Sequence, residues 1–325
     1  RLLKNLFSLS LLTLLFIGCD FTDYVSLHHD DVNTHNDVNN QDTQIGELNR
    51  HFNDAASQYQ VPKELLKVLA YYATNWEVSQ EAHSHQEEKF TIMALSEDAL
   101  AEASERLGIS VSEIKASPKE AIRAVASLIQ TKARLTFGDD YVSKTTIGDF
   151  FEIVGQLNGS HDLVIEQYFS DEIYDLLHQG YTVTLSSGET LKIAPLEDAA
   201  FERNYTSTPI PSAYLKKNTK NLDNSVADSF ISAHSANYTS TNGRTIKRII
   251  IHTIEGSSSS AINWFRNKSA KVSAHYVISK SGRITQMVRE KDKAYHAKYH
   301  NSDTIGLEHG GYASRGDFTY EEYKA

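Results

Sequence analysis

The spacing of apolar residues changes once along this chain and divides it into two kinds of structure. Between residues 45 and 178 apolar side chains recur at the period of an α-helix, as in Leu48, Phe52, Ala55 and Tyr59. After residue 181 short alternating or continuous apolar runs replace that period, which is the pattern of strands. We therefore expect an all-helical region followed by a region of mixed strands and helices.

Helix start and stop signals divide the first region into separate segments. Pro62 suits a first helical position, Ser117 and Glu120 have the spacing of a capping box, and Gly180 is placed to end the last helix. A small hairpin should follow, because Gly188 lies between two short strand-like runs. The expected helices cover residues 45–59, 62–76, 99–107, 117–129, 147–157 and 163–178, and the hairpin strands cover 182–185 and 190–193.

The second region is built around two strands that end in polar side chains. Three consecutive isoleucines at residues 249–251 predict a central strand buried on both faces, and His252 follows them. A polar residue in this place lies where open α/β sheets form ligand crevices. Ser257 can cap the next helix, and an alternating strand ends at Glu308. Further strands are expected at residues 276–278 and 283–288.

The first 19 residues have the layout of a secretion signal. Arg1 and Lys4 precede an apolar run at residues 6–17, which is shorter than a membrane span, and Gly18-Cys19 then resembles a bacterial lipobox. We expect Cys19 to be lipidated and to anchor the protein in the cell envelope, facing the periplasm or the outside. The alternatives are an ordinary signal or a fortuitously apolar terminus.

Composition indicates the remaining domain boundaries and argues against nucleic acid as a partner. A net charge of -10 without basic clusters argues against nucleic acid binding, and 325 residues suffice for two folded domains. Residues 20–44 are rich in Asp, Asn and His and predict a flexible tether, whose His28, His29 and His35 we interpret as solvated. Residues 195–245 contain Pro209 and Pro211 and predict a linker between domains at 45–194 and 246–325.

The helical region resembles the lysozyme-like domain of soluble lytic transglycosylases. The resemblance rests on residues 55–76, which end in Asn75-Trp76, and on Ile92-Met93-Ala94-Leu95. That family places a glutamate general acid three residues before the tryptophan, where this chain has Ala73. A methyl group cannot protonate a glycosidic oxygen, so glycan cleavage is not expected, whereas affinity for glycan stays open.

The second region resembles the zinc-dependent N-acetylmuramoyl-L-alanine amidases of type 2, which include phage endolysins and peptidoglycan recognition proteins. The resemblance covers residues 247–311 in the family's order. It implies a mixed α/β sheet with flanking helices, and hydrolysis of the amide that joins N-acetylmuramic acid to the L-alanine of the stem peptide. Its motifs are Ile249-Ile-Ile-His252-Thr, Val272-Ser-Ala-His275-Tyr-Val-Ile, Gly282-Arg-Ile-Thr-Gln286, Tyr295-His296-Ala and Ile305-Gly-Leu-Glu308.

The resemblance also implies a role for individual residues. His252 matches the first Zn²⁺ ligand, and Glu308 matches the acid/base that takes a proton from water and passes it to the leaving amine. His275, His296 and Asn301 match residues of the substrate site, with His275 in a supporting place. The alternatives are a structural core histidine for His252, a solvated strand end for Glu308, and packing for His275 and His296. His300 and His309 are predicted to be surface residues.

Two departures from the family limit this prediction. Ala274 replaces a tyrosine that several members carry. The family's other two zinc ligands, a histidine and then an aspartate or cysteine, lie well downstream of the Glu308 strand, and we expect them beyond Ala325. Residues 1–325 are therefore expected to be part of a longer protein, and to be inactive or nearly so alone.

The predicted function is a zinc amidase of the α/β type with peptidoglycan as its partner and Zn²⁺ as its cofactor. Two alternatives from other classes stay open at this point. One is a non-catalytic peptidoglycan-binding module, which the same fold can support when a zinc ligand is lost. The other is a lytic transglycosylase, which Ala73 disfavours.

Overall fold

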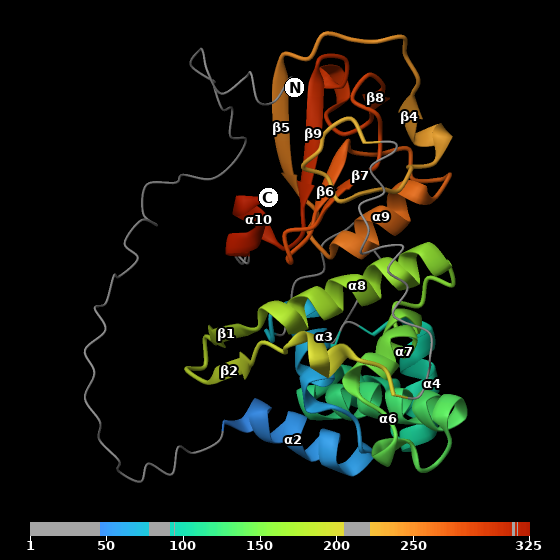
Figure 1. Cartoon of the computed structure of the whole chain (residues 1–325), viewed down its shortest axis with the longest axis vertical. Coiled ribbons are helices and arrows are strands. Elements are labelled where there is room, and N and C mark those ends of the chain that lie inside the picture. The colour runs from blue at the N-terminus through green and yellow to red at the C-terminus, as the bar shows by residue number, and fades with distance from the viewer. Residues whose placement is uncertain (1–45, 78–91, 94, 205–221, 314–315, 317) are drawn as a thin grey trace, which may run out of the picture. The chain divides into compact units, whose positions relative to one another are not determined.

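The computed structural model describes residues 46–77, 92–93, 95–204, 222–313, 316 and 318–325 (Figure 1). The predicted signal, Cys19 and the tether with its histidines therefore lie outside the described residues. Among the described residues, no helix combines the length and the apolar character that a membrane span requires.

Amphipathic helices form the first part of the described chain and enclose a large apolar core. Its centre is α6, which buries Ile122, Leu128 and Ile129 completely or nearly so. The helices are α2 (Glu47–Tyr59), α3 (Lys63–Thr74), α4 (Glu97–Leu107), α5 (Val111–Ala116), α6 (Pro118–Phe137), α7 (Phe151–Gln156) and α8 (Leu163–Gln179), with 3-10 turns η1 (Tyr141–Ser143) and η2 (Ile147–Phe150).

Local capping explains where several of these helices begin. Ser117 accepts a hydrogen bond from the Glu120 amide, as predicted, while the Glu120 side chain pairs with Arg123. The short helix α5 was not predicted, and it starts at a complete capping box between Ser110 and Glu113. Residues 147–157, predicted as one helix, begin with the tighter turn η2 before α7 continues.

A hairpin of β1 (Tyr181–Thr184) and β2 (Thr190–Ile193) follows the helices, as predicted. The remaining chain forms a mixed sheet in the order β3-β7-β6-β9-β5, in which β9 pairs in parallel with both β5 and β6. The strands are β3 (Ser229–Phe230), β5 (Arg248–Thr253), β6 (Tyr276–Ile278), β7 (Ile284–Gln286) and β9 (Thr304–His309), and the helices are α9 (Ser258–Arg266) and α10 (Tyr320–Lys324).

The predicted linker at 195–245 is wrong for its second half, because residues 222–245 belong to this α/β region. Strand β3 pairs with β7, and β4 (Tyr238–Thr239) pairs with β8 (Lys293–Ala294). Asn237 is fully buried, and its side chain donates to the carbonyls of Phe265 and Asn267. Two-residue strands are too short to leave a period in the sequence, which is why composition alone suggested a linker.

The prediction that residues 249–251 form a central strand is also wrong. Within the described residues β5 is the last strand of its sheet, and Ile249 and Ile251 are 44% and 57% exposed. Their side chains alternate with Ile250, which lies on the opposite face. Three isoleucines therefore mark a strand here without marking its place in the sheet.

The helical and α/β regions pack together, and the described residues from 46 to 325 belong to one compact unit. Helix α8 lies against α9, and Arg283, which precedes β7, reaches three carboxylates of α8. Its guanidinium lies 2.7 Å from Asp175 and 3.9 Å from both Asp171 and Glu172. We call these four residues the interface cluster. The two regions therefore share a buried polar contact.

Candidate functional site

Strands β5 and β9 bring the predicted zinc ligand His252 and the predicted acid/base Glu308 together. His252 and Glu308 are partners in the parallel register of these strands. Side chains of partners in neighbouring strands project from the same face of the sheet, so both lie on one face. Gly306, two residues before Glu308, lies on this face as well. The register therefore puts a carboxyl group and an imidazole together at one end of the sheet.

A second histidine approaches His252 from the loop after β8. The Nε2 of His252 lies 3.1 Å from the Nδ1 of His296. The other nitrogen of His296, Nε2, lies 3.1 Å from the hydroxyl of Thr304. That hydroxyl donates to the backbone carbonyl of His300 over 2.7 Å. His252 is thus the end of a continuous hydrogen-bonded chain.

The His296 ring rests directly on Gly306. A Cβ at residue 306 would come within 2.5 Å of the ring's Cγ, so a glycine is needed here. The side-chain oxygen of Asn301 accepts from the amides of His296 and Ala297, over 3.1 and 2.6 Å. Asn301 was predicted to contact substrate, and the structure places its oxygen on the backbone that positions His296.

His275 lies beside Gly306 and is fully buried. Its Nδ1 accepts from the Gly306 amide over 3.0 Å, and its Nε2 faces the Asp292 carbonyl at 3.1 Å. Burial and the neighbouring Arg244 guanidinium lower the pKa of His275 to about 3. The structure therefore puts His275 in a supporting position, where its ring does not line the surface. We call His252, His275 and His296 the histidine cluster.

Burial shifts the pKa values of the groups on this face toward their neutral forms. It raises the pKa of Glu308 to about 7 and lowers that of His252. Burial, followed by the proximity of His252 and Arg244, lowers the pKa of His296 to about 4. A carboxyl that titrates near neutral pH can exchange a proton with water and with a leaving group.

The described residues do not by themselves form a zinc site. Structural and catalytic zinc ions are held by three or four protein ligands, whereas no group of three His, Cys, Asp or Glu side chains in the described part of the chain is arranged to hold a metal. His252 is the predicted ligand here, and one of its nitrogens is already engaged by His296. We therefore derive no chemical step through a metal from these residues.

The two further zinc ligands, expected beyond Ala325, stay a prediction. The described chain ends at Ala325, one residue after α10, and this short helix brings no histidine or cysteine to the sheet. Its buried Glu322 caps its own helix by accepting from the Thr319 amide over 2.7 Å. Helix α10 thus supplies no substitute for the expected ligands.

Two of the surrounding histidines were predicted to be surface residues. His300 is exposed, as predicted. His309 fits the prediction only in part, because the residue is half-buried and its Nδ1 is buried without a hydrogen-bond partner among the described residues. The reason is that β9 lies between β5 and β6, so that its last residue stays within the sheet.

Three residues that hold the histidine cluster in place were not predicted from the sequence. Thr304, Gly306 and Arg244 all contact the histidine cluster. Gly306 did leave a signal, since an isolated glycine inside a strand indicates the close approach of another group. Thr304 and Arg244 left none, because a threonine that starts a strand and an arginine in a loop are common.

The helical region does not assemble a comparable pair. Ala73 lies at the end of α3, where Tyr72 contacts α9 and Asn75 accepts from Lys280 of the α/β region. Glu77 accepts from the amide and hydroxyl of Ser186 at the hairpin turn. No carboxylic acid therefore takes the place of the missing glutamate among these residues. The resemblance of this region to lysozyme-like domains stays a prediction.

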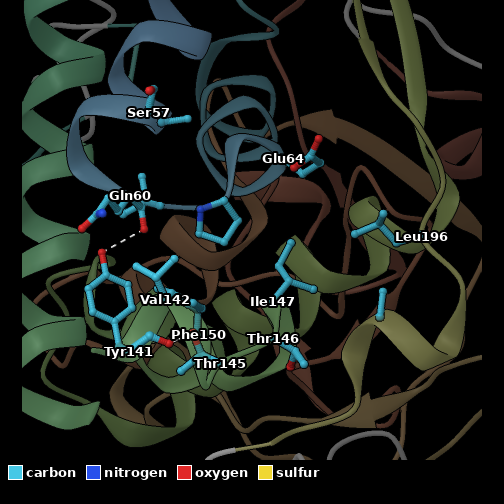
Figure 2. Close-up of a pocket in the computed structure, with 14 residues that line it drawn as sticks. Ser57, Gln60, Glu64, Tyr141, Val142, Thr145, Thr146, Ile147, Phe150 and Leu196 are labelled. Carbon is cyan, nitrogen blue, oxygen red and sulfur yellow. Dashed lines mark hydrogen bonds between the residues drawn. The ribbon is translucent and has the colours of Figure 1, made fainter. Parts of the chain in front are cut away.

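A separate cavity of about 520 Å³ lies at the opposite end of α3 (Figure 2). Tyr141 lies at its wall and donates to the Gln60 carbonyl, while Glu64 supplies a carboxylate. The rings of Tyr141 and Phe150 are buried, so they offer no flat aromatic surface on which a sugar could stack. Its lining residues are Ala56, Ser57, Gln60, Val61, Pro62, Glu64, Tyr141, Val142, Thr145, Thr146, Ile147, Phe150, Leu196 and Ala200.

Comparisons with known proteins locate the similarity in the α/β region. Residues 242–325 match the family model described as N-acetylmuramoyl-L-alanine amidase. N-acetylmuramoyl-L-alanine amidase A of Achromobacter lyticus is 55% identical over 83 residues, which are 25% of this chain and 46% of that protein. The chain thus spans about half the length of this curated relative. A selenomethionine crystal structure of AmpD matches 31% of this chain and 69% of its own, with 20% identity and a TM-score of 0.26.

Proposed function

We propose that this protein is a peptidoglycan hydrolase that cleaves the amide between N-acetylmuramic acid and the L-alanine of the stem peptide. The observation that carries the proposal is the register of β5 and β9, which puts His252 and Glu308 side by side on one face. This pair lies inside the residues that match the amidase family. The substrate bond is taken from the name of that family and of its relative.

In the proposed reaction Glu308 is the acid/base. Its carboxylate takes a proton from water, the water oxygen attacks the lactyl carbonyl carbon, and a tetrahedral intermediate forms. Glu308 then gives that proton to the alanine nitrogen as the C–N bond breaks, so the products are a carboxylic acid and a free amine. A pKa of about 7 for Glu308 supports both directions of proton transfer at neutral pH.

Zinc dependence is part of the proposal and rests on the family match, with His252 as one ligand. When bound, zinc would supply electrophilic assistance and lower the pKa of a bound water. The full-length protein should lose activity in the presence of a chelator and regain it with added Zn²⁺. Activity that survives complete metal removal would contradict this part of the proposal.

The principal experiment measures new amino termini released from purified peptidoglycan sacculi. The full-length protein supplied with zinc should release L-alanine amino termini, and Glu308→Gln should reduce the rate by roughly 100-fold to 10,000-fold. Glu290→Gln is a suitable control because Glu290 accepts from Tyr276 and lies outside the proposed pair. Equal release by wild type and Glu308→Gln would refute the assignment of the base.

A second candidate function is a peptidoglycan-binding module without turnover. One observation favours it, namely that the described residues hold no group of three metal-ligating side chains. Such a module would sediment with sacculi and release no amino termini, with or without zinc. Binding without release would therefore favour this alternative over the amidase.

We also propose that the protein is a lipoprotein of the cell envelope, anchored at Cys19. The support is the sequence layout of residues 1–19, which lie outside the described part of the chain. The mass of the protein extracted from membranes should exceed that of the cleaved polypeptide by the attached lipid. An unmodified Cys19 in that material would exclude the anchor.

A further inference from the structure

Each hydrogen bond in the series from His300 to His252 has a definite donor and acceptor. The assignment begins at the His300 carbonyl oxygen, which can only accept. The backbone carbonyl of His300 lies 2.7 Å from the Thr304 hydroxyl, whose single proton must point to it. If that proton pointed elsewhere, two oxygen lone pairs would face each other at this short distance. The Thr304 oxygen is therefore left as an acceptor.

His296 must then donate to Thr304 from its Nε2, across 3.1 Å. A neutral imidazole carries one N–H, so its other nitrogen, Nδ1, has a lone pair. The Nε2 proton that points to Thr304 is therefore the one N–H of a neutral His296 ring. The Nδ1 of His296 is thus an acceptor.

The acceptor on His296 determines the tautomer of His252. Because His296 Nδ1 lies 3.1 Å from His252 Nε2, the proton between them belongs to His252 Nε2. The remaining nitrogen, His252 Nδ1, keeps its lone pair. No hydrogen bond occupies this nitrogen among the described residues, in contrast to both nitrogens of His275.

The surroundings of Thr304 and His296 keep the donors and acceptors in this series of hydrogen bonds from changing places. Thr304 is fully buried, so water does not compete for its hydroxyl. The His296 ring is fixed from below by Gly306, where a Cβ would lie 2.5 Å from its Cγ, and its backbone is held by Asn301. The ring orientation is therefore fixed, with Nε2 toward Thr304 and Nδ1 toward His252.

We propose that Thr304 is a positioning residue, which acts through His296 to hold His252 in the tautomer with a proton on Nε2 and an available lone pair on Nδ1. This inference rests on the proposed function, because the proposed reaction takes place on the face that His252 shares with Glu308, where the Nδ1 lone pair of His252 is needed. The role resembles that of the outer hydrogen bonds that orient histidines in other active sites. Thr304 itself touches no reacting atom.

The test compares Thr304→Val, which keeps the shape and removes the hydroxyl, with Thr304→Ser, which keeps the hydroxyl. The full chain is labelled with ¹⁵N-histidine, and the two imidazole nitrogens of His252 are distinguished by NMR at neutral pH. Since the chain has 14 histidines, the His252 signals are assigned from their absence in His252→Asn. Wild type and Thr304→Ser should show Nε2–H, and Thr304→Val should show a mixture of tautomers.

The activity of the full-length protein gives an independent readout. Thr304→Val should lower the release of amino termini from sacculi by roughly 10- to 100-fold, and Thr304→Ser should restore most of it. A proton on Nδ1 of His252 in the wild type would overturn the inference even if Thr304→Val fails to fold. An unchanged tautomer in a folded Thr304→Val would overturn it as well. The expected tautomers together with no release by the wild type would refute the amidase and leave the positioning role standing.

Discussion

The histidine cluster and the interface cluster both bury ionisable side chains, but they do so in opposite ways. Burial lowers the pKa values of the histidines, and their ring nitrogens are joined in hydrogen bonds of defined direction. In the interface cluster three carboxylates share Arg283, and one oxygen of Asp171 has no hydrogen-bond partner among the described residues. The histidine cluster is suited to hold its side chains in one arrangement, whereas the stability of the interface cluster depends on the single cation Arg283.

The largest expected effect is on the charged cluster. Arg283→Met should lower the free energy of unfolding by about 3 to 5 kcal/mol, because it leaves buried carboxylates without their counter-charge. The measurement is urea denaturation of the full chain. Arg106→Met is the control, since Arg106 forms an exposed pair with Glu102 and its loss should change stability by less than about 1 kcal/mol. Equal effects of the two substitutions would contradict the proposed importance of the interface cluster.

The two clusters should also respond to pH with opposite signs. Burial raises the pKa values of Asp171 and Glu172 to about 7, above their unfolded values, so their contribution is fully present near pH 4 and is lost as the pH rises to 7. The lowered pKa of His296, about 4, gives stability that is present above pH 6.5 and is lost as the pH falls toward 4.

Removing the carboxyl groups of Asp171 and Glu172 separates their contribution to the free energy of unfolding from that of His296. In the double variant Asp171→Asn with Glu172→Gln, the free energy of unfolding should rise more steeply between about pH 4 and 7 than in the wild type. The difference between the two proteins should change by on the order of 3 kcal/mol over this interval. Urea denaturation at a series of pH values measures it. Parallel curves for the two proteins would show that these carboxyls titrate normally.

A smaller effect should follow from disturbing the geometry of the histidine cluster. Gly306→Ala should destabilise the fold by about 1 to 3 kcal/mol and displace His296, because the new Cβ would lie 2.5 Å from its ring. Gly310→Ala is the matched control, since its Cβ would meet no atom closer than 3.5 Å. Chemical denaturation and the NMR signals of His296 report the two effects. An undisturbed His296 signal in Gly306→Ala would contradict the close contact.

The smallest effect concerns one neutral hydroxyl between the helical and α/β regions. Tyr72→Phe removes a hydroxyl that lies within hydrogen-bond distance of the Ser258 and Ser259 hydroxyls, at 3.2 and 3.0 Å, and accepts from the Ser259 amide over 3.3 Å. The substitution should lower the free energy of unfolding by about 1 kcal/mol. Tyr299→Phe should have no measurable effect, because Tyr299 is 94% exposed. A loss for Tyr72→Phe as large as that for Arg283→Met would remove the distinction between neutral and charged contacts.

The helices could be predicted from the sequence because each buries a regular stripe against its neighbours. Leu48, Phe52 and Ala55 are buried as their spacing indicated, and Gly180 follows α8 directly. The weak points were short elements. Helix α5 and strands β3, β4 and β8 have too few residues for a period, so their place depends on partners far along the chain.

The candidate site could be predicted only as a set of residues. Motifs indicated His252 and Glu308, but their adjacency depends on the register between β5 and β9, which is formed across more than 50 intervening residues. The same holds for His275, whose burial under Gly306 comes from the pairing of β6 with β9. Local sequence contains no record of such pairings, and so the support given by Thr304 and Gly306 was missed.

The exposed isoleucines of β5 affect how the purified protein should behave in solution. Ile249 and Ile251 stand on the outermost strand of the sheet within the described residues, beside backbone groups that face outward. An apolar strand of this kind is a template for pairing with an identical strand from another molecule. Concentrated samples of these 325 residues should therefore self-associate, and Ile251→Lys should keep them dispersed.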